Sequence, residues 1–151
     1  MEPVAKTITV PGEPALVFEL FTSRIDEWWP KATHSVGGDD TAVVRVDPGV
    51  GGRAFEVTRD GVEHEWGRIT AWEPAARIAF TWHPGLAESQ STHVEITFRM
   101  SDEGTEVTLV HDGWEARGAD WKQMRDNYDT GWDHVLGRIP GSMPVAAVTG
   151  R

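Results

Sequence analysis

The sequence predicts an α+β fold in which a curved antiparallel sheet of six to seven strands grips one long C-terminal helix. Three observations lead to this prediction. Between residues 4 and 112, apolar residues recur mostly with a period of two, which is typical of strands with one buried face. Short turns rich in glycine, proline and aspartate separate these runs and favour antiparallel neighbours. From about Asp120 the apolar period becomes 3.6, which is typical of an amphipathic helix.

The clearest strand signal lies at residues 62–83. Two runs rich in aromatic and β-branched residues are separated by a turn at Pro74, which presets φ and cannot donate to a central ladder. In the second run Ile78, Phe80 and Trp82 alternate with smaller or polar residues, so we expect a β-hairpin with these three side chains on its covered face. In the first run Trp66 and Trp72 share a parity that Ile69 lacks, and a β-bulge between the tryptophans would reconcile this.

The remaining elements follow from local signals. A first strand precedes Pro11-Gly12, and Pro14 suits the first turn of a helix, where its missing N–H costs nothing. Aspartate- and glycine-containing turns separate the later strands. We expect strands near residues 4–10, 41–46, 53–59, 94–99 and 107–111, short helices at 15–21 and 25–29, and the long helix at 121–139.

Length and composition indicate one domain at residues 1–140, followed by a disordered tail at 141–151. The net charge of −10 repels phosphate groups, so we expect neither nucleic-acid binding nor attraction to anionic membranes. Without cysteine, disulfides and thiol catalysis are excluded. The N-terminus has no signal-peptide pattern and no apolar run has spanning length, so we expect no membrane insertion and a cytoplasmic location.

Five motifs together resemble one family. They are Trp66-Gly67-x-Ile69-x-x-Trp72-x-Pro74 followed by Ile78-x-Phe80-Thr81-Trp82, Pro14-Ala15-x-Val17-Phe18, Trp28-Trp29, Gly104-Thr105-x-Val107-x-Leu109-x-His111-x-Gly113-Trp114, and Gly131-Trp132. This pattern, over residues 4–139, is similar to the activator of heat-shock protein 90 (Hsp90) ATPase homologue family of the START-like (SRPBCC) superfamily. The resemblance implies a helix-grip fold that binds a hydrophobic small molecule or lipid under the C-terminal helix. It also implies a possible chaperone partner, because eukaryotic relatives act as co-chaperones.

From the apolar faces and the resemblance we predict non-catalytic binding of a hydrophobic or aromatic small molecule, or a lipid, between sheet and helix. The predicted contacts share the covered faces of their elements: Phe55, Val57, Phe80, Trp82, Ile96, Phe98, Leu109, His111, Met124, Tyr128 and Trp132. Arg53 and Arg59 share the face of Phe55, where they would either receive a carboxylate or extend to solvent.

Two alternatives stay open. An enzyme of cyclase or hydrolase type, as in other START-like proteins, would use His111 with Tyr128 for acid–base chemistry, whereas a purely structural role would bond both groups within the core. A chaperone-interaction module would expose aromatic side chains at Trp28, Trp29 or Trp114. The six histidines show no metal-binding spacing, so we expect no metal and no cofactor. A homodimer is compatible with the sequence, which does not identify the ligand.

Overall fold

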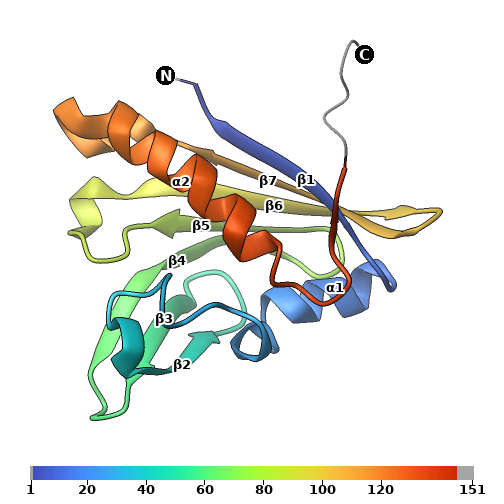
Figure 1. Ribbon diagram of the computed structural model, residues 1–151, viewed down its shortest axis with the longest axis horizontal. Helices are drawn as coiled ribbons and strands as arrows, with labels where there is room; N and C mark the ends of the chain where they lie inside the picture. Colours follow the sequence, from blue (N-terminus) through green and yellow to red (C-terminus); the bar gives the residue numbers. More distant parts are fainter. Residues whose placement is uncertain (1, 146–151) are drawn as a thin grey trace.

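The computed structural model describes residues 2–145 and has an eight-stranded antiparallel sheet covered on one face by helices (Figure 1). The strand order is β2-β3-β4-β5-β6-β7-β1-β8. The predicted α+β helix-grip fold is confirmed. In chain order the elements are β1 (Val4–Val10), α1 (Pro14–Phe21), η1 (Ile25–Glu27), η2 (Gly38–Asp40), β2 (Thr41–Val46), β3 (Arg53–Thr58), β4 (Glu63–Glu73), β5 (Arg77–Trp82), η3 (Glu88–Gln90), β6 (Thr92–Ser101), β7 (Gly104–Asp112), η4 (Trp114–Asp120), α2 (Trp121–Leu136) and β8 (Met143–Pro144).

The eighth strand lies where a disordered tail was predicted. Met143 and Pro144 pair with Thr9 and Ile8 at the edge of β1, and the Val145 N–H donates to the Thr7 carbonyl at 3.1 Å. The edge strand β1 offers free backbone groups, and this pairing satisfies some of them. Residues 146–151 of the predicted tail lie outside the described residues.

Helix α2 lies across one face of the sheet, with α1 beyond its C-terminal end (Figure 1). Its apolar stripe buries Trp132, Val135 and Leu136, as the 3.6-residue period predicts. On its edge, Asp129 and Asp133 accept from the Lys6 ammonium of β1 at 2.7 and 3.1 Å. The helix is therefore fixed to the sheet by apolar burial, with ion pairs at the margin that contribute little.

Two register irregularities decide which side chains face α2. One lies between Ile69 and Ala71 in the β4–β5 pairing and brings Ile69 and Trp72 to the same face, opposite Phe80 and Ile78. The second lies between Ala54 and Phe55 in the β3–β4 pairing, opposite Gly67 and Glu65, so Trp66 and Ile69 are both buried despite their opposite parity. Two irregularities, where the sequence predicted one bulge, thus reconcile the three positions.

The predicted orientation of β3 is wrong. Ala54 belongs to the main core, so by alternation Glu56 and Thr58 face the same side, while Phe55 and Val57 face the opposite side. The Arg53 guanidinium covers the Phe55 ring at 4.0 Å and also pairs with Glu63. The apolar appearance of Phe55 and Val57 misled the assignment, because the buried face of β3 carries a carboxylate.

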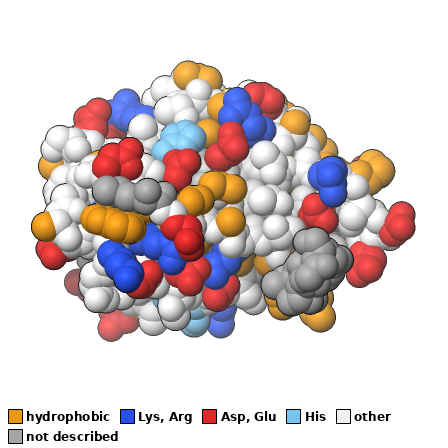
Figure 2. All heavy atoms as spheres, turned by 90° about the horizontal axis from the view of Figure 1, so that it is seen from above, with side chains coloured by type: hydrophobic (Ala, Val, Ile, Leu, Met, Phe, Trp, Pro, Cys, Tyr) orange, Lys and Arg blue, Asp and Glu red, His pale blue; other side chains and the backbone are white. Residues whose placement is uncertain are grey.

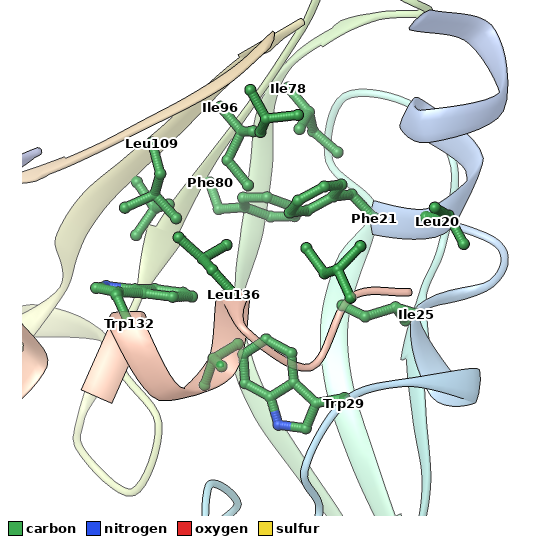
Figure 3. Close-up of a cluster of buried hydrophobic side chains, with 14 of the residues drawn as sticks. Leu20, Phe21, Ile25, Trp29, Ile78, Phe80, Ile96, Leu109, Trp132 and Leu136 are labelled. Atoms are coloured by element: carbon green, nitrogen blue, oxygen red, sulfur yellow. The ribbon is translucent and has the colours of Figure 1, made fainter. Parts of the chain in front are cut away.

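Most of the space between sheet and α2 is solid core. Figure 3 shows side chains of α2 meeting those of the central strands, with α1 and η1 closing one side. The predicted contacts Ile96, Phe98 and Leu109 are buried there, and Phe98 contacts the rings of Phe18 and Phe21 edge-on. A residual void of about 20 Å³ is too small for a ligand. The groove is thus closed along most of its length.

On the face shown in Figure 2, acidic and basic side chains are interleaved, without a broad basic area. This agrees with the net charge of −10 and gives no surface suited to a phosphate backbone on that face. Among residues 2–145, no helix has both the length and the apolar character needed to cross a membrane.

Candidate functional site

One cavity of about 310 Å³ lies at the end of the groove, between α2 and the loop that follows η1. We call it the tryptophan pocket, because four of the eight tryptophans line it together with Tyr128. The loop contributes residues 33–36, and the turn after β5 contributes Pro84 and Gly85. The full lining is Trp29, Thr33, His34, Ser35, Val36, Trp66, Trp82, Pro84, Gly85, Tyr128, Gly131, Trp132 and Val135.

The four indoles form a continuous aromatic wall. Ring centroids are separated by 4.9 Å for Trp29–Trp66, 5.6 Å for Trp66–Trp82 and 5.6 Å for Trp82–Trp132. The Trp132 ring also contacts the Trp29 ring edge-on, with centroids 6.1 Å apart, so the four indoles form a closed ring of contacts. Tilted and edge-on packing of this kind stabilises aromatic clusters and leaves large apolar surfaces beside the cavity.

Three of these indoles are held by hydrogen bonds from their N–H groups. Trp29 donates to the His34 carbonyl at 2.7 Å, and Trp132 donates to His111 Nδ1 at 3.0 Å. Trp66 donates to the Glu56 carboxylate at 2.6 Å. The Nε1 of Trp82 is buried and has no partner among the described residues. Buried donors are usually paired, so this unpaired N–H is an exception within the aromatic wall.

Glu56 connects the aromatic wall to the loop. Its fully buried carboxylate accepts from the backbone N–H groups of Val36 and Gly37 at 2.6 and 2.7 Å and from the Thr41 hydroxyl at 2.9 Å, besides Trp66. Burial alone would raise the pKa of Glu56, but these four hydrogen bonds together lower it below its usual range. Glu56 is therefore an anion that fixes the loop side and the sheet side of the pocket.

His111 is not placed at the pocket. It is completely buried beside Trp114, and both ring nitrogens are bonded within the core. Because Nδ1 accepts from Trp132, Nε2 carries the proton and donates to the Thr92 hydroxyl at 2.6 Å. Burial, followed by the electrostatic effects of Arg117 and of the neighbouring His93, lowers the pKa of His111 to about 3. In the enzyme hypothesis, His111 is therefore out of reach of a substrate in the cavity, whereas its predicted partner Tyr128 lines the cavity.

Arg117 is a second buried polar group outside the pocket. Its guanidinium donates to the carbonyls of Gln90 and Trp82 at 2.8 and 3.0 Å, and to the Thr92 hydroxyl at 3.3 Å. A further N–H approaches the sulfur of Met124 at 3.8 Å. Met124, a predicted ligand contact, therefore packs against η4 and does not line the cavity. Arg117 thus fixes η4, and with it the start of α2, against the ends of β5 and β6.

His34 lines the pocket, although its sequence context gave no sign of this. Its ring stacks on His134 of α2 with centroids 4.8 Å apart and planes 14° from parallel. Nδ1 hydrogen-bonds the Thr33 hydroxyl at 2.8 Å. Burial, followed by the neighbouring His134, lowers the pKa of His34. Loop residues have no periodicity, so only proximity in the fold reveals this group.

The predicted contacts therefore separate into three groups. Trp82, Tyr128 and Trp132 line the tryptophan pocket. Phe80, Ile96, Phe98, Leu109 and His111 belong to the closed core, with Met124 against Arg117. Phe55 and Val57 face away from α2.

The aromatic residues that an interaction module would expose are buried. Trp28, Trp29 and Trp114 are 6%, 8% and 0% exposed, and the Trp28 indole donates to the Leu20 carbonyl at 2.6 Å. Within residues 2–145 there is also no group of three or more histidine, aspartate or glutamate side chains arranged to hold a metal ion.

Comparison with known proteins identifies the family. The family model described as "Activator of Hsp90 ATPase homolog 1-like protein" matches residues 12–141. A search of curated proteins gave no match.

Solved structures extend this comparison. An anthrahydroquino-γ-pyrone synthase, Txn09, solved in complex with a compound designated SUM, is 31% identical over 85% of this chain and 88% of its own, with a TM-score of 0.60. The AHSA1-like protein from Aeromonas hydrophila is 22% identical over 91% of this chain and 89% of its own, with a TM-score of 0.61. DynU16, a putative protein of the dynemicin biosynthetic locus, is 19% identical over 92% of this chain and 46% of its own, with a TM-score of 0.65. The chain thus belongs to the activator of Hsp90 ATPase homolog 1-like family and has a START-like helix-grip fold.

Proposed function

We propose that the tryptophan pocket binds a planar aromatic small molecule. The observation that carries this proposal is the aromatic wall of four mutually packed indoles beside a cavity of about 310 Å³. Small-molecule sites typically have volumes of about 300–1,000 Å³, apolar walls and few polar groups. A flat ring system gains both apolar burial and stacking against such a wall.

The shape of the cavity favours a compact ligand over a long-chain lipid. A lipid tail would need an apolar channel along the groove, but that region is closed core with a void of only about 20 Å³. The polar side chains of the lining are few, namely Thr33, His34, Ser35 and Tyr128, and the Ser35 hydroxyl is already paired with Thr41. These groups suit an aromatic molecule with one or a few oxygen substituents.

The likeness to Txn09 supports the same ligand class. That synthase is named for an anthrahydroquinone and a pyrone, both flat ring systems, and its identity to this chain is 31% over most of both chains. This likeness supports the class of ligand, so binding is the primary proposal.

A binding titration with a blocked pocket tests this proposal. 9,10-Anthraquinone is added while quenching of tryptophan emission is followed, because four of the emitters line the cavity. Gly131→Leu places a side chain at the pocket wall, where a Cβ would already lie 3.7 Å from His34 Nε2. Thr130→Leu, at the adjacent exposed position of α2, is the matched control.

We expect wild type and Thr130→Leu to bind the probe with similar affinity, and Gly131→Leu to bind at least about tenfold more weakly, a difference of about 1.4 kcal/mol. Circular dichroism checks that all three are folded. Equal binding by wild type and Gly131→Leu would place the ligand elsewhere, and no binding by any of them would refute the proposed ligand class.

A second candidate function is catalysis of a ring-forming reaction on such a ligand. The identity to a synthase favours it. The test is to incubate wild type and Gly131→Leu with the substrate of that synthase and to follow new products by mass spectrometry. Product formation by wild type alone supports catalysis in the pocket, whereas bound but unchanged substrate supports non-catalytic binding.

A further inference from the structure

His34 is held at the wall of the tryptophan pocket by two elements. Its backbone carbonyl accepts from the Trp29 indole at 2.7 Å, which ties the loop to the aromatic wall. Its ring stacks on His134 of α2, with centroids 4.8 Å apart. The side chain is partly buried and lines the cavity. The imidazole is therefore positioned by tertiary contacts, as a group that reacts with a bound ligand must be.

The two ring nitrogens of His34 have different surroundings. Nδ1 is bonded to the Thr33 hydroxyl at 2.8 Å, whereas Nε2 has no hydrogen-bond partner among residues 2–145. Nε2 lies toward the backbone of Gly131, and the missing side chain there leaves space beside it. When Nδ1–H donates to Thr33, the lone pair of Nε2 is free to accept a proton.

We propose that His34 is a catalytic residue of the pocket, which accepts through Nε2 the proton of a hydroxyl group on the bound aromatic ligand. This inference rests on the proposed function, because it requires an aromatic ligand in the tryptophan pocket. It names the ligand class more closely, as a hydroxylated aromatic molecule. Burial and the neighbouring His134 lower the pKa of His34, so that the ring is in its neutral, proton-accepting form at pH 7.

The proton transfer would serve a ring closure without any cofactor. Nε2 takes the proton of the ligand hydroxyl, and the resulting oxyanion forms a C–O bond to the electron-poor carbon of a conjugated carbonyl in the same molecule. The C=C π bond breaks, its electron pair gives an enolate, and the enolate carbon takes the proton back from Nε2–H. The product is an isomer of the ligand, so atoms and electrons balance.

Ser35 and His111 cannot take this role, because their polar atoms are already engaged. The Ser35 hydroxyl donates to the Lys31 carbonyl and is paired with the Thr41 hydroxyl at 2.8 Å. His111 is sealed in the core with both nitrogens bonded. Among the described histidines, His34 is the one that lines the pocket.

The test compares two dyes of similar shape. 9,10-Anthraquinone has no hydroxyl group, and 1,2-dihydroxyanthraquinone changes its visible absorption when a hydroxyl ionises. Affinity for both is measured by quenching of tryptophan emission, and ionisation of the bound hydroxylated dye is followed by its absorption between pH 5 and 8. The proteins are wild type, His34→Gln, and His93→Gln as a control on β6 that does not line the pocket.

Glutamine keeps a hydrogen-bond donor at position 34 but cannot take a proton. We expect both variants to bind anthraquinone within about twofold of wild type. In His34→Gln the pH of half-ionisation of the bound hydroxylated dye should rise by about one unit, a tenfold change in the ionisation equilibrium. His93→Gln should behave as wild type.

Other outcomes separate the two proposals. If wild type binds neither dye, the proposed function fails. If both dyes bind but His34→Gln ionises the hydroxylated dye at the wild-type pH, His34 only donates or packs, and its assignment as proton acceptor is refuted. Loss of both dyes in His34→Gln would also refute it, because His34 would then shape the pocket rather than accept a proton.

Discussion

Replacing Glu56 by glutamine is the most direct test of how the pocket is held together. The carboxylate accepts four hydrogen bonds, from the N–H groups of Val36 and Gly37, the Thr41 hydroxyl and the Trp66 indole. Oε1 accepts from the N–H groups of Val36 and Trp66, and Oε2 accepts from the Gly37 N–H and the Thr41 hydroxyl. In Glu56→Gln one oxygen becomes an NH₂ group. The less costly orientation places it at Oε2, where the Thr41 hydroxyl can turn and accept from it, but the Gly37 N–H loses its acceptor and faces another donor.

The expected cost follows from this count. A buried donor left without a partner costs about 1–3 kcal/mol, so the unpaired Gly37 N–H predicts a loss of about 1–3 kcal/mol in the free energy of unfolding. For a domain of this size that lowers the midpoint of thermal unfolding by roughly 2–12 °C. Chemical denaturation followed by tryptophan emission measures it. Glu63→Gln is the matched control on β4, because its exposed ion pair with Arg53 is worth less than about 1 kcal/mol.

The pH dependence of the free energy of unfolding tests this account of Glu56 independently. Hydrogen bonding lowers the folded-state pKa of Glu56 below the unfolded value of about 4.3. The stabilisation by ionised Glu56 is therefore fully present above that unfolded pKa and is lost as the pH falls through the folded pKa. The stability difference between wild type and Glu56→Gln should be constant near neutral pH and shrink in acid. A variant as stable as wild type, or a difference that grows in acid, would refute this account of Glu56.

Three further predictions concern the pocket and its surroundings. Gly131→Ala should stabilise α2 by about 1 kcal/mol in thermal unfolding, because glycine is costly inside a helix and the added Cβ meets His34 Nε2 at an ordinary 3.7 Å; destabilisation would mean that the site tolerates no side chain. Trp132→Phe should cost about 1–3 kcal/mol more than Trp82→Phe in denaturation, because only the former leaves a buried partner, His111 Nδ1, without its donor; equal losses would deny that hydrogen bond a role. The ring signals of His111 in NMR spectra should not shift between pH 5 and 8, because its folded-state pKa is about 3. A titration near pH 6.5 would contradict its burial. The contribution of neutral His111 to stability is complete above the unfolded pKa of about 6.5 and declines below it.

The fold was predictable because its signals are local. Alternation along β5, β6 and β7 and the 3.6-residue period of α2 each follow from the geometry of one element, so they identified the sheet and its covering helix. The spacing of Trp66, Ile69 and Trp72 even required a bulge, and one lies between Ile69 and Ala71. The same motifs pointed to the family that the family model identifies.

Local alternation defined the two faces of β3 but did not show which of them is buried. Strand β3 alternates regularly, but its inward face is the one that carries Ala54 and Glu56, because loop donors converge on Glu56, although its sequence neighbours Phe55 and Val57 are more apolar. A buried carboxylate is favourable only when several donors converge on it. Those donors come from residues 15 to 20 positions earlier and 10 positions later in the chain, so no short sequence pattern around Glu56 predicts its burial.

The sequence by itself determined the fold class, the family and the aromatic character of the interior, because these depend on period and composition. Only the tertiary structure decided that most of the groove is filled and that a cavity remains at one end. It also decided that His34, rather than His111, lines that cavity. The physical reason is that a cavity is the space left when distant segments pack, and both its position and its free polar atoms depend on contacts between residues far apart in the chain.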